Sequence, residues 1–228
     1  SAPPWSVIEK VYIKQQTYSV AAQAGIPAPK TWVVSSAEEA QKLPLHFPVI
    51  LKPSIRDHYY RKTKTKALKA SDREALTNLF KMMERVIPAE EILIQEFIPG
   101  GAARLYSAGV FFRNGRIHAG IVGRRARQHP MDFGHATTYA EPANLPLLLE
   151  RAERFLSAIG YSGIAEVEFL QDARDDEFKL IEVNPRIWGW HLLAIANGFE
   201  LPWYAYQDLI GQMPDSPQPI QPPIRWVR

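Results

Sequence analysis

The acidic residues best suited to chemistry lie on two neighbouring segments, 163–170 and 177–183, whose composition predicts strands joined by an acidic turn. Side chains alternate along a strand, so Glu182 and Asn184 share one face, and a hairpin brings Glu168 beside Glu182. Two carboxylates and an amide oxygen are ligands for a hard cation such as Mg²⁺, which usually shares them with phosphate oxygens. The sequence therefore predicts a magnesium site on this strand pair.

Alternation alone leaves two questions about this strand pair open. Glu166 shares a face with Glu168, so either carboxylate fits the cation. A Glu-x-Asn triplet is also common by chance, and a solvated strand end with scattered charges is the favoured explanation of the triplet when it stands alone. Arg186 follows closely enough to reach a phosphate.

A lysine ends a short apolar strand predicted over 47–52, just before Pro53. A charge at the end of a buried strand is costly unless an anion pairs with it, which makes Lys52 a candidate phosphate ligand. The alternative is a lysine that extends its ammonium from the strand end into water. Lys14, on the first predicted helix, carries no signal by itself.

A further strand ends with Gln95, Glu96, Phe97 and Ile98, directly before Pro-Gly-Gly. A strand end that crosses between two lobes offers backbone N–H and C=O groups to a heterocycle such as adenine. A core strand followed by a linker is the simpler explanation of this segment alone.

The net charge is only +3, but basic residues are concentrated in two stretches, 56–69 and 124–127. Such clusters suit an anionic small molecule, such as a nucleotide, as readily as a polymer. A charge run is more often a solvated face. The mild net charge does not require nucleic acid, and no Gly-x-x-x-x-Gly-Lys-Ser/Thr loop is present, so a P-loop enzyme is disfavoured.

Composition limits the class of protein. The chain has 228 residues, 46% of them hydrophobic and 22% charged, which is typical of a globular protein. It has no cysteine, which excludes disulfides and thiolate metal sites. No apolar stretch is long enough to span a membrane, and the first residues do not resemble a signal peptide. We expect a cytoplasmic protein with no membrane or nucleic-acid partner.

Periodicity and turn residues predict the elements that must position these groups. Helices are expected over 8–24, 36–42, 71–86, 145–160, 190–197 and 201–210. Strands are expected over 31–34, 47–52, 66–70, 92–98, 106–112, 116–123, 163–170 and 177–183. Irregular loops are expected over 54–65 and 124–135, and an extended proline-rich tail from 213.

This order predicts an α+β fold made of two α+β lobes with a ligand held in the cleft between them. We expect a helical segment over 1–29, a small lobe over 30–98, a large lobe with the metal site over 99–212, and a tail over 213–228. The capping box of the helix that starts near residue 71 is assigned to Ser71 and Glu74.

Taken together and in order, five motifs resemble the ATP-grasp superfamily over about residues 9–210. They are the segments 13–14 with 24–29, 47–53, 94–100, 165–169 and 180–186. The similarity is greatest to predicted ATP-dependent carboligases and to the ATP-binding half of carbamoyl-phosphate synthase. The segments 123–125, 133–134 and 188–191 carry that closer similarity.

The resemblance implies the ATP-grasp fold and roles for individual residues. Those expected to contact ATP are Lys14 and Lys52 at the phosphates, Gln95 at adenine, and the backbone of Glu96, Phe97 and Ile98, also at adenine. The implied metal ligands are Glu168, Glu182 and Asn184, which decides for Glu168 over Glu166, with Mg²⁺ as the metal and Mn²⁺ as an alternative. The expected catalytic residues are Arg186 and Arg125. Trp188, Trp190 and His191 are expected near the substrate, as are Arg124 and Arg127.

The implied activity is the phosphorylation of a carboxylate to an acyl phosphate, which an amine or similar nucleophile then attacks. The alternative is an ATP- and magnesium-binding module that needs a missing Rossmann-like domain or partner subunit. A nucleic-acid-binding domain that uses the basic loops is a third reading of the same residues. Two departures from the family pattern are a basic, aromatic segment over 54–66 where relatives are glycine-rich, and Ile13 where an acidic residue often stands. The carboxylate or amine substrate is not identified by the sequence.

Overall fold

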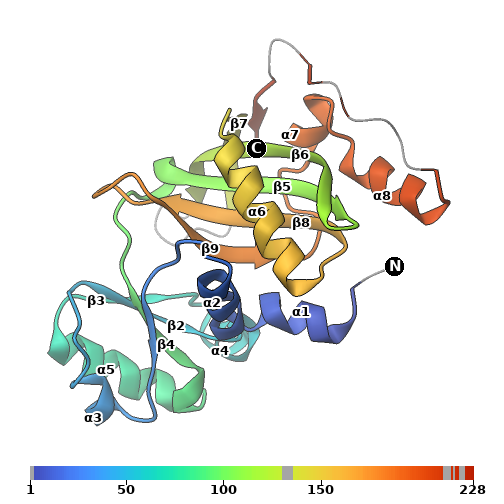
Figure 1. The fold of residues 1–228 in the computed structure, drawn as a ribbon. Coiled ribbons are helices and arrows are strands. Elements are labelled where there is room, and N and C mark those ends of the chain that lie inside the picture. Colours follow the sequence, from blue (N-terminus) through green and yellow to red (C-terminus); the bar gives the residue numbers. More distant parts are fainter. Residues whose placement is uncertain (1–2, 130–135, 213–216, 218, 221–223) are drawn as a thin grey trace.

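Two antiparallel sheets, each with helices packed against it, form the two lobes of the protein in the computed structural model (Figure 1). The structure describes residues 3–129, 136–212, 217, 219–220 and 224–228. The small sheet has the strand order β1-β4-β2-β3, and the large sheet has the order β10-β7-β6-β5-β8-β9. The expected α+β fold is confirmed.

The strands of the small sheet are β1 Thr31–Val33, β2 Val49–Pro53, β3 Leu68–Ala70 and β4 Ile92–Glu96. Those of the large sheet are β5 Leu105–Arg113, β6 Arg116–His129, β7 Ala136–Pro142, β8 Gly163–Gln171, β9 Phe178–Asn184 and β10 Trp226–Val227. The helices are α1 Trp5–Tyr12, α2 Lys14–Gln23, α3 Ala37–Ala40, α4 Arg56–Thr63, α5 Arg73–Glu84, α6 Pro146–Ile159, α7 Leu192–Ala196 and α8 Leu201–Leu209. Two short 3₁₀ turns, Ala89–Glu91 and Ala102–Arg104, precede β4 and β5.

Helix α5 supplies much of the small lobe's core. Leu76, Phe80 and Met83, spaced four and three residues apart, are fully buried on the helix face that packs against β2, β3 and β4. Asp72 caps this helix, because its carboxylate accepts a hydrogen bond of 2.8 Å from the backbone N–H of Ala75. The prediction of Ser71 as the cap is therefore wrong by one residue.

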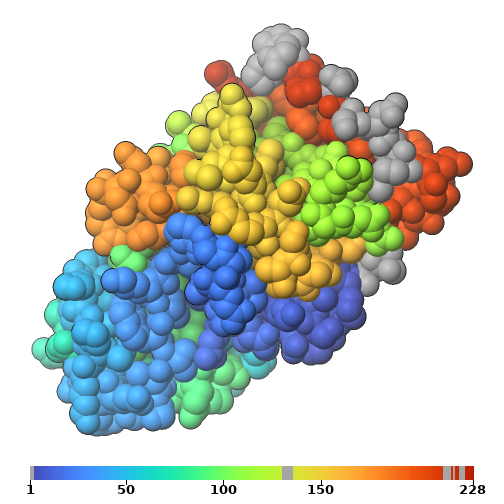
Figure 2. Space-filling view, viewed as in Figure 1, coloured from blue at the N-terminus to red at the C-terminus, as the bar shows by residue number. Residues whose placement is uncertain are grey.

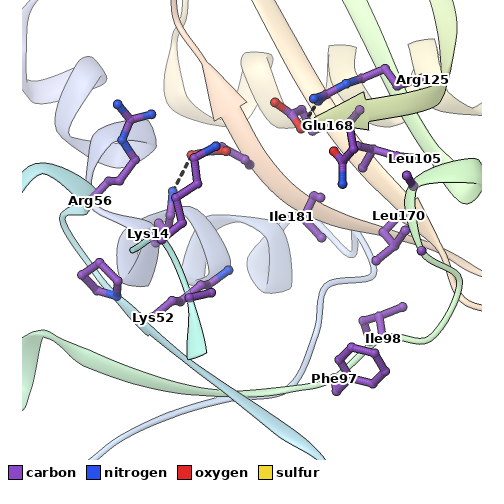
Figure 3. A pocket seen from close by; sticks show the side chains of 17 residues that line it. Lys14, Lys52, Arg56, Phe97, Ile98, Leu105, Arg125, Glu168, Leu170 and Ile181 are labelled. Atoms are coloured by element: carbon purple, nitrogen blue, oxygen red, sulfur yellow. Dashed lines mark hydrogen bonds and ion pairs between the residues drawn. The ribbon is translucent and has the colours of Figure 1, made fainter. Parts of the chain in front are cut away.

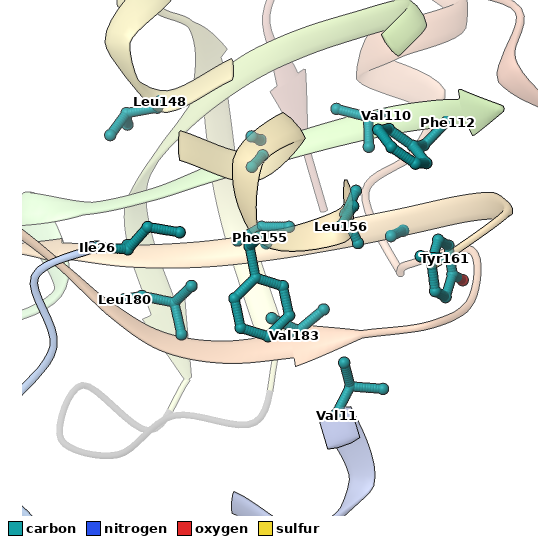
Figure 4. Packing of buried hydrophobic residues seen from close by; sticks show 14 of the residues in the cluster. Val11, Ile26, Val110, Phe112, Leu148, Phe155, Leu156, Tyr161, Leu180 and Val183 are labelled. Carbon is teal, nitrogen blue, oxygen red and sulfur yellow. The ribbon is translucent and has the colours of Figure 1, made fainter. Parts of the chain in front are cut away.

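Helix α6 crosses one face of the large sheet and closes the larger core (Figures 1 and 4). Its buried side chains Leu148, Phe155 and Leu156 share this core with Val183 of β9 and Val11 of α1. Burying a side chain of this size contributes about 1.5–3 kcal/mol. The core therefore fixes β9, with its candidate ligands, and ties the first helix to the large lobe.

The expected helix over 8–24 is two helices separated by an extended Ile13, with φ −92° and ψ 105°. The β-branched side chain tolerates this conformation well. Because of the break, α2 starts at Lys14, whose backbone N–H donates to the Ser54 carbonyl at 3.0 Å. Helix α2 lies where the two lobes meet, between the small lobe and α6 (Figures 1 and 2).

The predicted loops 54–65 and 124–135 are regular over 56–63 and 124–129, where these predictions are wrong, and residues 130–135 lie outside the described residues. Residues 56–63 form α4, because Tyr59 is buried in the small lobe's core and Arg61 pairs with Asp57 one turn away. Strand β6 continues to His129, because β7 supplies a partner for its charged half. The motif at 133–134 lies outside the described residues. No helix in the described parts of the chain is long and apolar enough to cross a bilayer.

Candidate functional site

The register of the β8–β9 hairpin brings the predicted acidic residues together. Glu168 pairs with Glu182 across the hairpin, and Glu166 pairs with Asn184. Directly opposed residues have Cβ atoms about 5 Å apart, and alternate residues of a strand share a face. Two adjacent cross-strand pairs therefore present three carboxyl groups and one amide on the same face of the large sheet.

Two cations from distant parts of the chain neutralise this acidic group (Figure 3). Lys14 Nζ at the start of α2 lies 2.5 Å from Glu182 Oε1, and Arg125 Nη1 on β6 lies 2.5 Å from Glu168 Oε2. Arg125 is buried, and its Nε donates to Thr137 Oγ1 on β7 at 2.7 Å. Each carboxylate thus has a cation held in place by another element of the fold.

The ion pair with Lys14 keeps Glu182 charged. Burial by itself raises the pKa of Glu182, but the nearby Lys14 ammonium outweighs it and lowers the pKa to about 2. Burial likewise lowers the pKa of Lys14, but the Glu182 carboxylate reverses that effect and raises it. Both groups are therefore ionised at neutral pH.

Glu166 behaves differently from its neighbours. Burial first, and then the negative charge of Glu168, raise the pKa of Glu166 to about 8, against the opposing effect of Arg125. Its Oε2 accepts a hydrogen bond of 3.2 Å from Asn184 Nδ2. At pH 7 the carboxyl group of Glu166 is therefore mostly protonated, whereas Glu168 and Glu182 each form an ion pair with a cation.

Asn184 connects the two strands at the site. Its Nδ2 donates to Glu168 Oε1 at 2.9 Å, and its Oδ1 accepts from Arg186 Nη2 at 3.3 Å. Two carboxyl groups and an amide oxygen form an oxygen-only donor set, which fits a hard divalent cation such as Mg²⁺. No three His, Asp or Glu side chains in the described ranges are arranged to hold a metal, so such a site depends on the Asn184 oxygen.

A cavity of about 260 Å³, called the first cavity here, opens between the lobes beside this face (Figure 3). Its apolar end is lined by Phe97, Ile98, Leu105, Leu170 and Ile181. Its polar end is lined by Lys14, Lys52, Arg56, Lys66, Arg125, Glu168 and Glu182. A molecule with a flat apolar group at one end and several negative charges at the other matches this division.

Lys52 is held at the cavity by an aromatic side chain. Its Nζ lies 2.5 Å from Tyr18 Oη, which in turn donates to the backbone carbonyl of Ile181 at 2.8 Å. Burial first, and then the charge of Lys14, lower the pKa of Lys52 to about 7. Near neutral pH this ammonium therefore lacks a full counter-charge, and an anion in the cavity supplies one.

Of the four residues expected at adenine, two line the first cavity and two do not. Phe97 and Ile98 line the first cavity. The side chain of Gln95 is buried and donates to Thr31 Oγ1 at 2.7 Å, and Glu96 forms an ion pair of 2.5 Å with Arg174. Neither Gln95 nor Glu96 lines the cavity, and their roles at adenine stay predictions.

A second cavity of about 180 Å³ adjoins the same acidic residues and extends toward Asn184 and Arg186. The lining that it shares with the first cavity consists of Arg56, Lys66, Arg125, Glu168 and Glu182. The lining that is its own consists of Ala136, Thr137, Glu166, Asn184, Arg186, Trp188, Gly189, Trp190, Trp226 and Arg228. The two cavities therefore meet at the predicted metal ligands.

Glycines on the central strands make room for the tryptophans of the second cavity. A Cβ atom on Gly109 of β5 would lie 2.2 Å from the Trp188 ring, and one on Gly123 of β6 would lie 2.6 Å from the Trp190 ring. Trp188 and Trp190 are both buried and meet edge to face. Only glycine at these two positions allows the rings to pack on the sheet.

Three predicted substrate residues lie outside both cavities. Arg124 pairs with Glu141 at 3.5 Å, Arg127 donates to Thr138 at 3.0 Å, and His191 Nδ1 contacts the Trp188 carbonyl at 2.8 Å. Sequence reasoning missed Tyr18, Trp226 and Arg228. No pattern marks these residues, because each reaches the site through tertiary packing.

Comparison with known families and proteins finds similarity to ATP-binding and ligase sequences. Residues 136–205 match the model of the family described as carbamoyl-phosphate synthase L chain, ATP binding domain. The chain is 24% identical over 221 residues to D-aspartate ligase of Enterococcus faecium, covering 92% of this chain and 52% of that protein. The chain thus spans about half the length of this curated relative.

Solved structures with the same architecture include enzymes that bind nucleotide. The biotin carboxylase domain of 2-oxoglutarate carboxylase from Hydrogenobacter thermophilus, in complex with MgADP, ADP and bicarbonate, superposes with a TM-score of 0.76 at 17% identity. That match covers 93% of this chain and 48% of the other. L-amino acid ligase from Bacillus licheniformis superposes with a TM-score of 0.69 at 18% identity, covering 96% and 51%.

Proposed function

Because the chain has the ATP-grasp fold, as its motifs predicted, we propose that it binds ATP with magnesium and acts as the catalytic part of a carboxylate–amine ligase. The observation that carries this proposal is the pairing of Glu168 with Glu182 at the junction of the two cavities. One cavity suits a nucleotide, and the other suits the carboxylate that the nucleotide phosphorylates.

The division of the first cavity into an apolar and a polar end supports one orientation of ATP. The adenine ring occupies the apolar end against Phe97 and Ile98, and the phosphates extend toward Lys14 and Lys52. A unit charge pair at 4 Å is worth about 4 kcal/mol near a protein surface, so two lysines are a substantial anchor for triphosphate. The Lys52 ammonium, which hydrogen-bonds Tyr18 but lacks a full counter-charge, supports this orientation.

Glu168, Glu182 and Asn184 would hold magnesium at this site. When bound, the ion neutralises charge that develops on the phosphate oxygens. With magnesium bound, Glu182 and Glu168 would no longer depend on Lys14 and Arg125 alone for charge compensation, and these two cations could contact phosphate oxygens.

The reaction proposed for this site has two steps. An oxygen of the substrate carboxylate attacks the γ-phosphorus of ATP, the bond from that phosphorus to the bridging oxygen breaks, and ADP leaves with the electron pair. An amine nitrogen then attacks the acyl carbon, the carbon–oxygen bond to phosphate breaks, and the nitrogen loses a proton. Arg125 and Arg186 stabilise the negative charge of the transferring phosphoryl group and of the acyl phosphate.

The relatives that suggest the proposed activity are longer than this chain. D-aspartate ligase and L-amino acid ligase are each about twice as long as the part that matches. We propose that a Rossmann-like domain or a partner subunit contributes to the choice of the amine. The carboxylate is the substrate that this chain itself positions.

The test uses ATP, magnesium, and a panel of carboxylates and amines, with release of ADP and phosphate as the readout. Carboxylate-dependent ADP release supports the proposal. Glu182→Gln is expected to weaken magnesium-dependent ATP binding at least tenfold or to abolish turnover. Glu150→Gln, an exposed change of the same kind on α6, is the control and is expected to have no effect. Unchanged ATP binding and turnover in Glu182→Gln would defeat the metal assignment.

A further inference from the structure

The short strand β10 brings two residues of the chain's end into the second cavity. Trp226 and Val227 pair antiparallel with Ala140 and Tyr139 of β7. The backbone N–H of Arg228 donates to the Thr138 carbonyl at 3.1 Å and extends this pairing by one residue. Trp226 and Arg228 both line the second cavity as a result.

A buried asparagine holds the chain that leads into β10. Asn197, at the end of α7, donates from Nδ2 to the Ile224 carbonyl at 2.9 Å and accepts from the Ile224 N–H at 2.8 Å. Its own backbone carbonyl accepts from Ile220 N–H at 3.1 Å. Both ends of one amide are thus used to fix a segment 27 residues away in sequence, so the position of β10 is built into the fold.

The second cavity has more positive charge than its carboxylates can balance. Among the side chains of the described residues, five cations and three carboxylates line it, a side-chain net charge of +2 even with every one of these carboxylates ionised. Arg56, Lys66 and Arg125 also line the first cavity, where the phosphates are proposed to lie. Arg186 and Arg228 are the cations that belong to the second cavity alone.

These two arginines differ in their contacts. Arg186 donates to Asn184 and to the carbonyl of Ile187 and lies beside the predicted metal ligands. Within the described residues, the side chain of Arg228 has no carboxylate within ion-pair distance. Its guanidinium is therefore available to an anionic group at the end of the cavity formed by β10.

Size and shape limit the molecule that fits. The second cavity is the smaller of the two, with a volume of about 180 Å³ against about 260 Å³. The lining is mostly polar, and Trp188, Trp190 and Trp226 supply its aromatic part. A short carbon skeleton with polar groups at both ends matches this lining.

We propose that the carboxylate substrate is a small acid with a second anionic group, and that Arg228 binds this second group. The first carboxylate faces Arg186 and the predicted metal ligands, where it is phosphorylated. This inference rests on the proposed function for the orientation of the acid. Arg228 is a specificity residue in this arrangement, because it contacts the end of the substrate that does not react.

Succinate and butyrate provide a matched pair of probes, since both have four carbons and only succinate has two carboxylates. Isothermal titration calorimetry on the full 228-residue chain, with and without saturating MgADP, measures the binding of each. Succinate is expected to bind at least tenfold more tightly than butyrate. Arg228→Gln is expected to weaken succinate about tenfold or more and to leave butyrate unchanged, because a charged hydrogen bond is lost.

Arg225→Gln is the control, because Arg225 precedes the same strand but pairs with Glu141 and does not line the cavity. It is expected to bind both acids as the unaltered chain does. A third probe, 3-phosphonopropionate, distinguishes a carboxylate from a phosphate as the preferred second group, since tighter binding than succinate would assign a phosphate-like group to Arg228.

Two outcomes overturn the inference. One is equal affinity for succinate and butyrate, or no succinate binding, with and without nucleotide. The other is a preference for succinate that Arg228→Gln leaves unchanged. Failure of MgADP to bind, while succinate remains selective and dependent on Arg228, would instead contradict the proposed ATP-dependent function and leave the specificity assignment supported.

Discussion

Lys14, the first residue of α2, and Glu182, near the end of β9, are 168 residues apart in sequence and form an ion pair of 2.5 Å. The pair joins the N-terminal helices to the hairpin that carries the predicted metal ligands. Lys14 and Glu182 both line the first cavity, and each compensates the charge of the other.

Breaking this pair should cost stability in a pH-dependent way. Lys14→Met leaves the Glu182 carboxylate without its partner and is expected to lower the free energy of unfolding by about 1–3 kcal/mol at pH 7. The pKa of Glu182 is depressed to about 2 from a usual 4.5, so the pair's contribution is present above pH 4.5 and disappears as the pH falls toward 2. Urea denaturation at pH 7 and pH 3 should therefore show a smaller difference at the lower pH.

The double variant Lys14→Met/Glu182→Gln serves as the control for this experiment. It should be more stable than the sum of the two single changes predicts, with a coupling energy of about 0.5–3 kcal/mol. Additive single changes would show that the pair contributes nothing to folding.

Nucleotide affinity should depend on the protonation of Lys52. The pKa of this lysine is about 7 in the nucleotide-free protein, whereas phosphate binding favours the charged ammonium. Above pH 7 ATP binding must therefore take up a proton, and the affinity should fall as the pH rises, by at most tenfold per pH unit. Calorimetry in buffers of different ionisation enthalpy at pH 8 should detect that proton uptake.

Lys52→Ala should bind ATP about tenfold more weakly at pH 6, keep its fold, and show much less proton uptake at pH 8. Lys81→Ala, on the exposed face of α5, should resemble the unaltered chain. Equal affinity and equal proton uptake in Lys52→Ala and the unaltered chain would remove Lys52 from the nucleotide site.

The Tyr18 hydroxyl is expected to matter for both stability and nucleotide binding. Tyr18→Phe removes the hydrogen bonds to Ile181 and Lys52, which should lower the free energy of unfolding by about 1–2 kcal/mol. It should also weaken ATP severalfold, because Lys52 is no longer held at the cavity. Tyr161→Phe is a matched control, since the Tyr161 hydroxyl donates to the Ile164 carbonyl at 2.7 Å away from both cavities. That control should lose similar stability with unchanged ATP affinity, and the same loss of affinity in both variants would refute the positioning role.

Gly109→Ala should disrupt the second cavity through Trp188. The added methyl group would lie 2.2 Å from the indole ring, so the ring must move, at a cost of about 1–3 kcal/mol. Differential scanning calorimetry should record a Tm lower by about 2–10 °C for a chain of this size. Gly189→Ala, which meets no atom within 4 Å, should leave the Tm within 1 °C, and a similar fall in both variants would show that the tight packing on Gly109 is not the cause.

Much of the fold followed from local patterns. The amphipathic period of α6 and the alternation along β8 and β9 depend on neighbours three, four or two residues apart, so a single segment contains the whole signal. The shared face of Glu182 and Asn184 follows from that alternation. The loop predictions over 56–63 and 124–129 were wrong for the opposite reason, because α4 and the second half of β6 are stabilised by the small lobe's core and by β7.

By itself the sequence determined which chemical groups are available and on which faces of their own elements they lie, because strand and helix geometry is local. Only the tertiary structure decided which of them meet. The register of β8 and β9 places Glu168 opposite Glu182, and the break at Ile13 places Lys14 beside that pair. The hydrogen bonds of Asn197 to Ile224 position the segment that carries Arg228 into the second cavity. These contacts join residues far apart in the chain. They form only when separate elements pack together, and that packing cannot be read from the pattern within any one segment.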